Sequence, residues 1–448
     1  MNDQPVPVVK DLVLIGGGHT HVGVLKRFGM RPIAGVRLTL ITRDVHTPYS
    51  GMLPGLVSGH YDFDDVHIDL APLSRFAGAR LFHQPVTGLD LERRRVLCEG
   101  RPPVPYDLLS INTGSTPSFR GVPGAAELVV PVKPISRFVP RWEQLRARVA
   151  AADGRMRVGV VGAGAGGVEL ILAVEYALRH ACQAAGRPAD TVELHLFGAT
   201  DTILSTHNRG MRRRLERILR ERGVQLHLGQ TVAAVAEGQL SLADGGTVTL
   251  DEILWVTQAG AAPWLAESGL DVDERGFVRV DDTLQSRSHP GVFVAGDVAA
   301  VVNHPREKAG VFAVRQGPPL ADNLRRALLG RSLRPFRPQR RFLTLVSTGG
   351  RHAVGSRGWW SFEGDAVWRW KDWIDRRFMT SYSDLPAMSE ETAPTIDPGL
   401  AAPEVLREIS TAAMRCGGCG SKVGATPLGR VLEQLQPVRR DDVIIGLD

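Results

Sequence analysis

Two glycine-rich segments follow short apolar runs of the sequence, and each could bind the phosphates of a dinucleotide. The first runs from Gly16 to His21, and the second runs from Gly162 to Gly167. Glycines at this spacing permit a tight turn and a close approach of the backbone to a pyrophosphate, which the N-terminus of the following helix attracts. Two such segments predict two bound dinucleotides, and therefore electron transfer between them.

The first segment departs from the usual pattern at its third position. Gly16 and Gly18 occupy the first two positions, but His21 stands where glycine or alanine is usual. An acid commonly binds a ribose at the end of the next strand, where this sequence reads Thr42-Arg43-Asp44. We expect Thr42 or Asp44 to take that role through a hydrogen bond.

The second segment has all three glycines of the pattern, at Gly162, Gly164 and Gly167. The next strand ends at Phe197-Gly198, which offers neither an acid for a ribose hydroxyl nor an arginine for a 2′-phosphate. The sequence therefore leaves the choice between NADH and NADPH open. A degenerate site that no longer binds a nicotinamide nucleotide is the alternative.

A third segment, residues 292–297, reads as a short buried strand that ends in Gly296 and Asp297. A carboxylate at a strand end can accept hydrogen bonds from a ribitol chain while nearby amides bind the flavin phosphate. A strand and turn of this kind are common by themselves. After two phosphate-binding segments, they favour a flavin dinucleotide in the first fold.

These segments together resemble the flavoproteins that bind two dinucleotides, namely disulfide reductases, type II NADH dehydrogenases and sulfide:quinone reductases. The resemblance covers residues 11 to about 330, and residues 47–54 are similar to the loop beside the isoalloxazine ring in type II NADH dehydrogenases. It implies FAD in the first fold and NAD(P)H in the second. The residues it implies for FAD are Gly16, Gly18, His19, Thr42, Arg43, Thr47, Pro48, Thr113, Gly114, Gly296 and Asp297, and those for NAD(P)H are Gly162, Gly164 and Gly167.

The cysteines distinguish members of this group from one another. The helix expected after the first loop contains no cysteine, whereas a disulfide reductase carries its redox pair there. Cys98 lies in a strand far from the loop ends and Cys182 lies late in the helix of the second domain, so we interpret both as ordinary core or surface residues. We therefore expect electrons to leave the flavin directly, toward quinone or another small acceptor. An oxidoreductase of the sulfide:quinone reductase type, acting on a selenium or sulfur species, is the alternative.

Three further residues are candidates for catalysis. The resemblance implies that Glu169 lies near the nicotinamide and the flavin, although a solvated carboxylate at a helix N-terminus is an equal alternative. Gln316 matches a position that contacts quinone in type II NADH dehydrogenases, and the neighbouring Arg315 departs from that pattern. Lys308 precedes the same helical segment.

The order of expected elements predicts an α/β protein with two Rossmann-like domains, β-meander elements and a small C-terminal α+β segment. We expect a discontinuous FAD domain at 1–115 and 260–335, an NAD(P) domain at 150–258, a C-terminal segment at 336–385, and a linker at 386–412. Single strands are expected over residues 86–97 and 104–111. Helices are expected near residues 142–151 and 320–329.

Composition restricts the partners. The 448 residues carry a formal net charge of +6 and include 43% hydrophobic residues, which is usual for a globular protein. A basic protein favours anionic neighbours, but no basic run accompanies a nucleic-acid motif. No secretory signal or membrane span is visible, so we expect a cytoplasmic protein, with peripheral attachment to the inner membrane face left open. No metal site is expected, and a homodimer stays open.

Residues 359–379 combine tryptophan and arginine. On helical spacing, Val367, Trp370, Ile374 and Phe378 form one stripe. Such a helix could lie at a membrane interface, or could pack on the flavin domain with its arginines outward. The packed arrangement is slightly favoured because the stretch is short.

Residues 414–423 form a Cys- and Gly-rich stretch that contains Cys416 and Cys419. One such pair could be half a zinc site, but no second pair follows. The stretch resembles the start of selenide, water dikinase, which implies catalytic roles for Cys419 and Lys422. We interpret residues 413–448 as an N-terminal fragment of that kinase, truncated before its ATP-binding domains. A fusion of this kind predicts a link to selenium metabolism, or a flavin-binding scaffold for the kinase.

Overall fold

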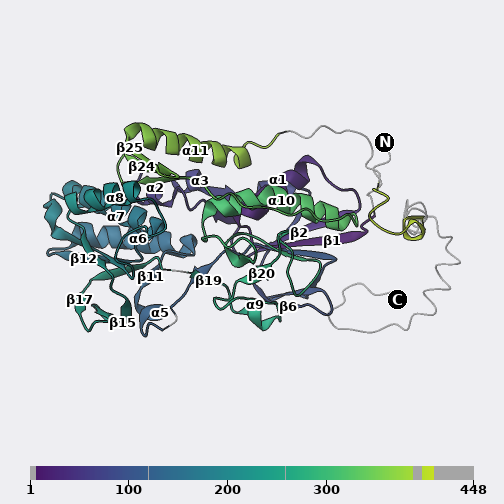
Figure 1. The fold of residues 1–448 in the computed structure, drawn as a ribbon, viewed down its shortest axis with the longest axis horizontal. Coiled ribbons are helices and arrows are strands. Elements are labelled where there is room, and N and C mark those ends of the chain that lie inside the picture. Colours follow the sequence, from purple (N-terminus) through teal and green to yellow (C-terminus); the bar gives the residue numbers. More distant parts are fainter. Residues whose placement is uncertain (1–6, 120, 258, 387–395, 408–448) are drawn as a thin grey trace, which may run out of the picture.

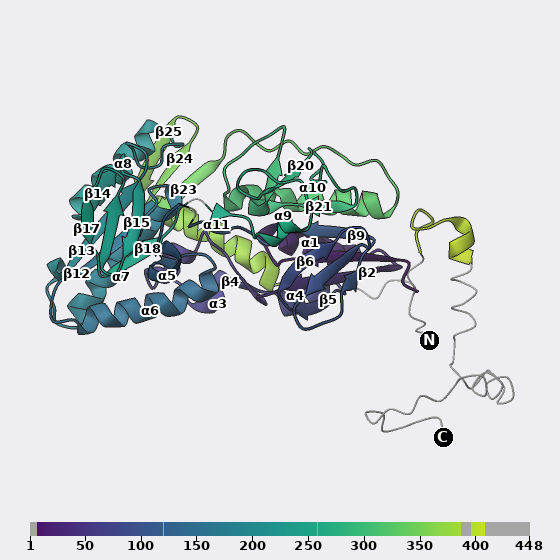
Figure 2. The same ribbon diagram turned by 90° about the horizontal axis from the view of Figure 1, so that it is seen from below.

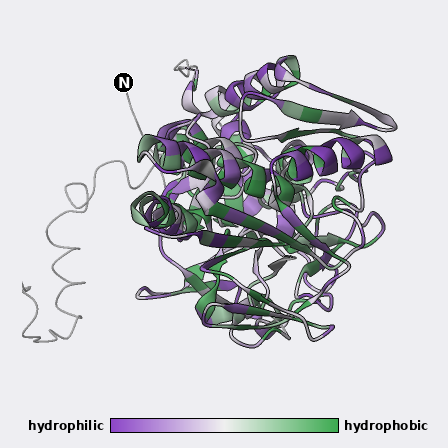
Figure 3. Cartoon of the chain, turned by 90° about the vertical axis from the view of Figure 1, so that its left-hand side faces the viewer, coloured by the Kyte–Doolittle hydropathy of each residue, from purple (hydrophilic) through white to green (hydrophobic). Residues whose placement is uncertain are grey.

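The computed structural model describes residues 7–119, 121–257, 259–386 and 396–407 (Figure 1). Within this part of the chain, two five-stranded parallel sheets lie at opposite ends of the long axis, and each carries helices on its faces (Figures 1 and 2). The expected α/β class with two Rossmann-like folds is therefore confirmed. Stretches of hydrophobic residues follow the central strands, as Figure 3 shows.

The first sheet has the strand order β21-β9-β1-β2-β5, and all its neighbours are parallel. Helix α1 (His19–Met30) connects β1 to β2 as the sequence predicts, and α10 (Gly310–Leu328) packs beside it. The hydroxyl of Thr20 in α1 donates to the carbonyl of Ala313 in α10 at 2.7 Å. The strands are β1 (Lys10–Ile15), β2 (Val36–Thr42), β5 (Arg80–His83), β9 (Leu108–Ile111) and β21 (Val292–Val294).

The second sheet has the order β11-β18-β12-β13-β14 and is again parallel throughout. Its covering helices are α6 (Ile135–Ala151), α7 (Ala165–Ala184) and α8 (Arg209–Glu221). Phe138 and Trp142 of α6 are fully buried, so this helix begins earlier than the expected 142–151. The strands are β11 (Val130–Pro131), β12 (Met156–Val161), β13 (Val192–Gly198), β14 (Gln225–Leu228) and β18 (Glu252–Trp255).

Three antiparallel meanders accompany the parallel sheets. The strand expected over residues 86–97 is instead a hairpin, because the Asp90 carboxylate accepts the Arg93 N–H at 2.9 Å and Arg94 takes a left-handed conformation. The meanders are β6 (Val86–Asp90), β7 (Arg95–Cys98) and β8 (Val104–Pro105); β15 (Val232–Ala236), β16 (Gln239–Leu242) and β17 (Thr247–Thr249); and β23 (Leu343–Ser347), β24 (Ala353–Arg357) and β25 (Trp360–Gly364).

Short elements connect these layers. They are β3 (His46–Pro48), α2 (Leu53–Val57), α3 (Phe63–Val66), β4 (His67–Asp69), α4 (Leu70–Phe76), β10 (Thr116–Pro117), α5 (Ala125–Leu128), β19 (Ala259–Gly260), α9 (Trp264–Glu267), β20 (Val278–Val280) and β22 (Ala299–Val301), with 3₁₀ turns at Ala189–Thr191 and Gly296–Val298. Strands β10 and β19 pair where the chain passes between the two sheets. We keep the expected domain bounds as a proposal, and note that β11 and α6 already belong to the second half.

The last described elements return to the body of the protein. Helix α11 (Asp365–Ser383) lies across both halves, along the top of Figure 1. Residues 396–407 then come back to the first sheet, where Leu400 is fully buried. A Cβ at Gly35 would lie 2.9 Å from the Leu400 side chain, so this segment packs tightly on the half of the molecule that is built on the first sheet.

Candidate functional site

The turn after β1 requires glycine at its first position. Gly16 has a φ of +87°, and a Cβ there would lie 2.6 Å from the backbone oxygen of Asn112. The Gly16 N–H donates to the Ile41 carbonyl at 2.7 Å, and the Gly18 N–H donates to the Asn112 carbonyl at 3.2 Å. These contacts fix the turn at the carboxyl ends of β1, β2 and β9, where a parallel sheet binds its ligand.

Asn112 caps the helix that follows this turn. Its buried side-chain oxygen accepts the N–H groups of Thr20 and His21 at 3.1 and 3.2 Å. Its side-chain nitrogen donates to the Ala295 carbonyl at 2.7 Å, next to the Gly296-Asp297 turn. Asn112 therefore joins the first glycine-rich loop to the Gly296-Asp297 turn, a role that the sequence did not reveal. We call this turn the flavin turn, after the cofactor expected there. The available signals for Asn112 were its position at the end of a buried strand and its place in the Asn112-Thr113-Gly114 stretch, which contributes to the family resemblance.

His21 occupies the third position of the pattern without disrupting it. Its ring is fully buried, Nδ1 lies 2.7 Å from the Gly16 carbonyl, and Nε2 lies 2.8 Å from the Ser110 hydroxyl. A carbonyl only accepts, so Nδ1–H donates and Nε2 accepts from Ser110. Burial lowers the pKa of His21 to about 4, which keeps the ring neutral. A hydrogen-bonded side chain thus supports the turn where glycine usually allows close packing.

His19, at the start of α1, lies between an aromatic and a charged group. Its ring centroid is 5.4 Å from that of Tyr49, and Asp297 and Lys133 influence its charge. Burial lowers the pKa of His19 to about 4. Its Nε2 is buried and has no hydrogen-bond partner among the described residues. An orphaned polar atom beside the phosphate loop fits a bound ligand that would supply the partner.

Asp297 forms the charged centre of the flavin turn. Its carboxylate lies 3.0 Å from Lys133 Nζ and accepts the Ser115 hydroxyl at 3.2 Å. Burial would raise the pKa of Asp297, but Lys133, Ser115 and Lys308 together hold it below its ordinary value. Because Lys133 follows β11, this ion pair joins the two halves of the molecule.

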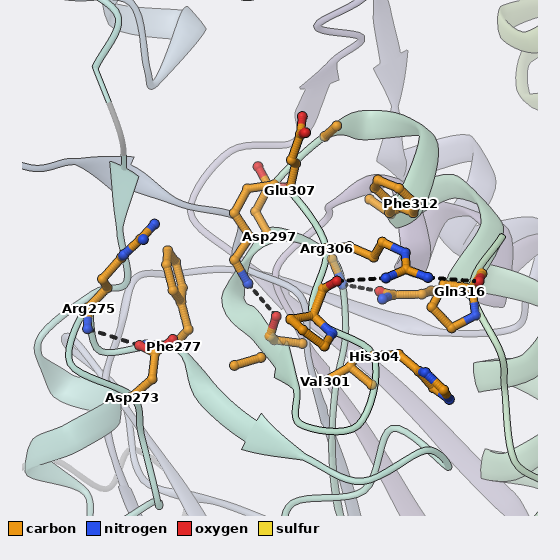
Figure 4. Close-up of a pocket in the computed structure, with 18 of the residues that line it drawn as sticks. Asp273, Arg275, Phe277, Asp297, Val301, His304, Arg306, Glu307, Phe312 and Gln316 are labelled. Carbon is orange, nitrogen blue, oxygen red and sulfur yellow. Dashed lines mark hydrogen bonds between the residues drawn. The ribbon is translucent and has the colours of Figure 1, made fainter. Parts of the chain in front are cut away.

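Gln316 and Lys308 support the same turn from α10 and the loop before it. The Gln316 side-chain oxygen accepts the Gly296 N–H at 2.6 Å. Lys308 Nζ lies 4.1 Å from the centroid of the Phe277 ring, and burial lowers its pKa to about 8. Gly296, Asp297, Lys308 and Gln316 all line one cavity of about 380 Å³, shown in Figure 4. We call it the flavin-turn cavity.

The remaining residues implied for FAD surround the loop. Thr47 donates its hydroxyl to the Gly17 carbonyl at 2.6 Å, and Pro48 follows it in β3. Gly114 has a φ of +74° and opens onto free space, next to the exposed Thr113. At the end of β2, Thr42 donates to the Asp44 carbonyl at 2.9 Å, and the Arg43 guanidinium pairs with the Asp44 carboxylate.

Taken together, these residues fit FAD. They supply a glycine turn that a Cβ would fill, a helix N-terminus, an orphaned imidazole nitrogen and a carboxylate at the strand end. When bound, FAD would supply the electron-accepting ring, with the loop at Gly16 and Gly18 on its diphosphate and Asp297 on its ribitol chain.

The second loop combines close packing with a backbone hydrogen bond, from the Gly162 N–H to the Phe197 carbonyl at 2.9 Å. A Cβ at Gly167 would lie 1.7 Å from the carbonyl of Gly162, whose own φ is +124°. Gly164, directly before α7, has open space at its Cβ position, which a pyrophosphate could occupy. The three predicted glycines therefore fill the three roles of the pattern.

Glu169 lies inside the protein, so it is not the solvated carboxylate of the alternative interpretation. Its Oε1 accepts the Ser347 N–H at 2.7 Å and lies 3.9 Å from Lys371 Nζ. Lys371 lies 2.7 Å from Asp375 and donates to the Gly51 carbonyl at 2.6 Å. These contacts bring α7, α11 and the loop before α2 together.

The charges of this cluster depend on one another. Burial raises the pKa of Glu169 and of Asp375, while Lys371 opposes both shifts. The two carboxyl groups in turn hold the pKa of Lys371 above its ordinary value in spite of burial. The hydroxyl of Tyr49, which lies in the loop similar to the isoalloxazine loop, hydrogen-bonds to Asp375. We call Tyr49, Glu169, Lys371 and Asp375 the buried charge cluster.

The buried stripe of α11 differs from the expected one. The residues that face inward are Val367, Lys371, Asp375 and Met379, at intervals of four. The expected stripe holds at Val367 and Phe378 but fails at Trp370, because buried ion pairing, which apolar periodicity cannot register, turns Lys371 and Asp375 inward. Trp370 and Trp373 are 43% and 57% exposed instead.

Several predictions concern features outside this site. Cys419 and Lys422 lie outside the described residues, as do the kinase fragment and most of the expected linker. Among the described residues, no group of histidine, cysteine or acidic side chains could hold a metal ion. In the same part of the chain, no helix has both the length and the apolar character needed to cross a membrane.

Comparisons with known proteins agree with this geometry. A family model described as pyridine nucleotide-disulphide oxidoreductase matches residues 10–323. The chain is 26% identical over 353 residues to the NADH dehydrogenase-like protein YutJ of Bacillus subtilis, covering 77% of this chain and 91% of that protein. It is 27% identical over 329 residues to the type II NADH:quinone oxidoreductase Ndh of Mycobacterium tuberculosis, covering 67% of this chain and 69% of that protein.

Solved structures share the fold at low sequence identity. NDH2 from Plasmodium falciparum in complex with NADH superposes with a TM-score of 0.71 at 12% identity, covering 85% of this chain and 100% of that chain. The sulfide:quinone oxidoreductase from Aquifex aeolicus gives a TM-score of 0.70 at 18% identity, covering 84% of this chain and 92% of that chain.

Proposed function

The chain belongs to the pyridine nucleotide-disulphide oxidoreductase family, and we propose that it passes electrons from NAD(P)H through FAD directly to a small acceptor, without a redox disulfide. Membership makes it an FAD-dependent NAD(P)H oxidoreductase with FAD and NAD(P)H as cofactors. The single observation that carries the proposal is the presence of two glycine-rich loops together with a Gly296-Asp297 turn, which Asn112 joins to the helix after the first loop and Gln316 joins to α10. Cys98 and Cys182 support it because both are free thiols, and Cys182 is buried near the end of α7.

The residues of the flavin half bind and orient, and the cofactor performs the electron transfer. We propose that Gly16, Gly18 and the α1 N-terminus bind the flavin diphosphate, and that Gly162, Gly164 and Gly167 bind that of NAD(P)H. Lys308 lines the same cavity as Asp297 and supplies positive charge there, which would stabilise negative charge on a reduced ring.

The buried charge cluster would hold a proton between the two halves. Glu169 has a raised pKa, so it takes up a proton more readily than an exposed carboxyl does. We propose that Glu169 retains this proton close to the reacting groups, and that Lys371 positions it. The acceptor needs protons as well as electrons when it is a quinone.

Quinone is the acceptor that the relatives favour, since the Mycobacterium protein is named an NADH:quinone oxidoreductase. Quinones of the membrane require contact with a bilayer. We propose peripheral attachment through Trp359 and Trp360, which are 77% and 63% exposed at the turn between β24 and β25. Exposed tryptophans are characteristic of membrane interfaces.

Steady-state reduction of a short-chain ubiquinone analogue by NADH or NADPH tests the proposal. The FAD-loaded protein should turn over, and Glu169→Gln should lower kcat about tenfold or more while leaving FAD bound. Glu175→Gln is the matched control, because Glu175 is buried on the same helix but pairs with Arg222 at 3.0 Å. Equal effects of the two substitutions would contradict the role of Glu169, and no turnover with either nucleotide would contradict the function.

A selenium or sulfur species is the second candidate acceptor. It rests on the resemblance of residues 414–423 to selenide, water dikinase, and these residues lie outside the described part of the chain. Replacing the quinone by selenite or elemental sulfur in the same assay separates the two acceptors. A scaffold without turnover would leave NAD(P)H unoxidised with all of them.

A further inference from the structure

A second cavity of about 380 Å³ lies beside the flavin-turn cavity, between three parts of the chain. Its lining includes His207 and Asn208 before α8, the loop at Arg306 and Glu307, and the region of β23 and β24 with Arg340 and Arg341. Arg306, Glu307 and Phe312 line both cavities. We call the second one the arginine cavity.

The charges in the arginine cavity are unbalanced. Three guanidinium groups, of Arg306, Arg340 and Arg341, face one carboxylate, that of Glu307. The guanidinium of Arg306 donates to the backbone carbonyls of Pro305, Pro338 and Gln339, which leave its charge uncompensated. Arg340 and Arg341 have no ion pair among the described residues. Burial lowers the pKa of His207, and Glu307 opposes that shift, so the imidazole adds little charge.

Two arginines of α8 are paired, since Arg214 and Arg217 both lie close to Glu363, at 2.8 and 3.0 Å. Arg209 and Arg357 are next to the lining residues Asn208 and Gly358 and have no ion pair among the described residues, so the positive charge extends beyond the cavity itself. A net positive cavity with guanidinium donors fits a phosphate group, which accepts several hydrogen bonds and carries negative charge.

The cavity adjoins the exposed tryptophan pair. Gly358, which lines the cavity, directly precedes Trp359. The side-chain nitrogen of Asn208 donates to the carbonyls of Gly358 and Trp360 at 3.0 and 3.1 Å, so cavity and tryptophan turn are held together. Tryptophan rings prefer the level of lipid headgroups, which places a basic cavity next to the phosphates of a bilayer.

We propose that the arginine cavity binds the headgroup phosphate of an anionic lipid when the tryptophan turn docks on a membrane. The proposal rests on the membrane contact proposed above and adds its lipid class. Arg340 and Arg341 supply the charge, while Trp359 and Trp360 supply the apolar contact. Because the two cavities share Arg306, Glu307 and Phe312, the lipid site also adjoins the flavin turn.

Vesicle flotation with the FAD-loaded protein tests this, using phosphatidylcholine vesicles with and without 30% phosphatidylglycerol at 0.15 M salt. The protein should bind the anionic vesicles more tightly. Arg340→Ala/Arg341→Ala should remove most of this preference, lowering the partition to anionic vesicles by about tenfold or more, since arginines near an anionic surface are attracted to it. Binding to neutral vesicles should persist.

A charge-matched control separates the cavity from the net charge of the protein. Arg93→Ala/Arg155→Ala removes two exposed arginines from the β6–β7 turn and from the loop before β12, away from both cavities. This control should keep the preference for anionic vesicles. Equal losses in the two double variants, or equal binding of the unmodified protein to both vesicle types, would overturn the proposal.

Further arms distinguish the possible sources of the phosphate. Glycerol 1-phosphate at 10 mM should compete weakly with anionic vesicles, because it lacks the contact of the tryptophan turn; complete competition would indicate a site for a soluble phosphate ester and overturn the lipid assignment. Trp359→Ser/Trp360→Ser should abolish binding to both vesicle types. If the unmodified protein bound no vesicle, the proposed membrane contact would fail as well. Binding without headgroup preference would contradict the arginine cavity alone.

Discussion

The two phosphate loops of this chain reach the same backbone shape by different means. In the second loop, Gly167 packs directly on Gly162, and a side chain at either position would collide with backbone. In the first loop, His21 replaces the packing glycine, and its ring donates to Gly16 while Asn112 caps the helix. At the third position of the pattern, therefore, the second loop is specified by an absent side chain, and the first by a buried hydrogen-bond network. Such a network depends on the presence of every partner.

The largest effect should come from Gly16→Ala in the first loop. The Cβ of an alanine there would lie 2.6 Å from the Asn112 carbonyl oxygen, and the residue would have to keep a φ of +87°. We expect FAD affinity to fall by about 100-fold or more, because left-handed strain and the collision both oppose the turn. Fluorescence of released FAD after dialysis measures this loss. Gly78→Ala, which has a positive φ but open space around it, should retain FAD; release from both variants would indicate a nonspecific effect of strain.

The next largest effect should come from Asn112→Ala. This change leaves the buried N–H groups of Thr20 and His21 and the carbonyl of Ala295 without partners, so we expect a loss of about 3 kcal/mol in the free energy of unfolding. FAD affinity should fall as well. Urea denaturation with and without FAD measures both.

Asn323 provides the matched comparison for Asn112. It is equally buried and also makes three hydrogen bonds, to Thr283 and Arg334, away from the loop. Asn323→Ala should destabilise the protein by a similar amount without changing FAD affinity. If both variants lost FAD equally, Asn112 would contribute only to the stability of the protein. It would then have no special role in joining the first loop to the flavin turn.

Acid should weaken the first loop more than the second. The pKa of His21 is about 4 in the folded protein and about 6.5 when unfolded, so the unfolded chain binds a proton that the folded one excludes. Its contribution to stability is fully present above about pH 6.5 and is lost as the pH falls toward 4, by about 3 kcal/mol. Melting temperatures between pH 7.5 and 4.5 measure the loss.

His21→Ala should flatten that pH dependence in part, since His19 has a similarly lowered pKa and remains. The variant also places at the third position a residue type that the usual pattern allows. An unchanged pH profile would show that the imidazole of His21 is not the acid-sensitive group.

The smallest effect on stability should come from Gly164→Ala in the second loop. Its Cβ would meet nothing within 4 Å, so the melting temperature should stay within about 1 °C. The methyl group would occupy space expected for the pyrophosphate, and KM for NAD(P)H should rise about tenfold. A KM equal to that of the unmodified protein would place the nucleotide elsewhere.

The sequence predicts the loops and sheets well because their signals are local. Glycine spacing and short apolar runs identify β1, α1, β12 and α7 to within a few residues. The role of Asn112 could not be predicted, because its partners Thr20 and Ala295 lie about 90 and 180 residues away. Only the fold brings these groups together.

The burial of charged residues on α11 could not be predicted from the sequence either. Apolar periodicity favours burial of Trp370, but Lys371 and Asp375 are buried because Glu169 and Gly51 supply their partners. From sequence alone a charged residue is expected to be exposed, because charged residues are seldom buried unless a counter-ion pairs with them. Similarly, the arginines at 306, 340 and 341 are ordinary in sequence, and only the cavity makes them a group.

Anaerobic titration of the FAD-loaded protein with NADH and with NADPH tests the central claim most directly. At least one nucleotide should bleach the flavin absorbance near 450 nm at about one equivalent, and Gly164→Ala should require higher concentrations. If the flavin stayed unbleached with either nucleotide in large excess, this result would contradict electron transfer from the nicotinamide nucleotide to the flavin.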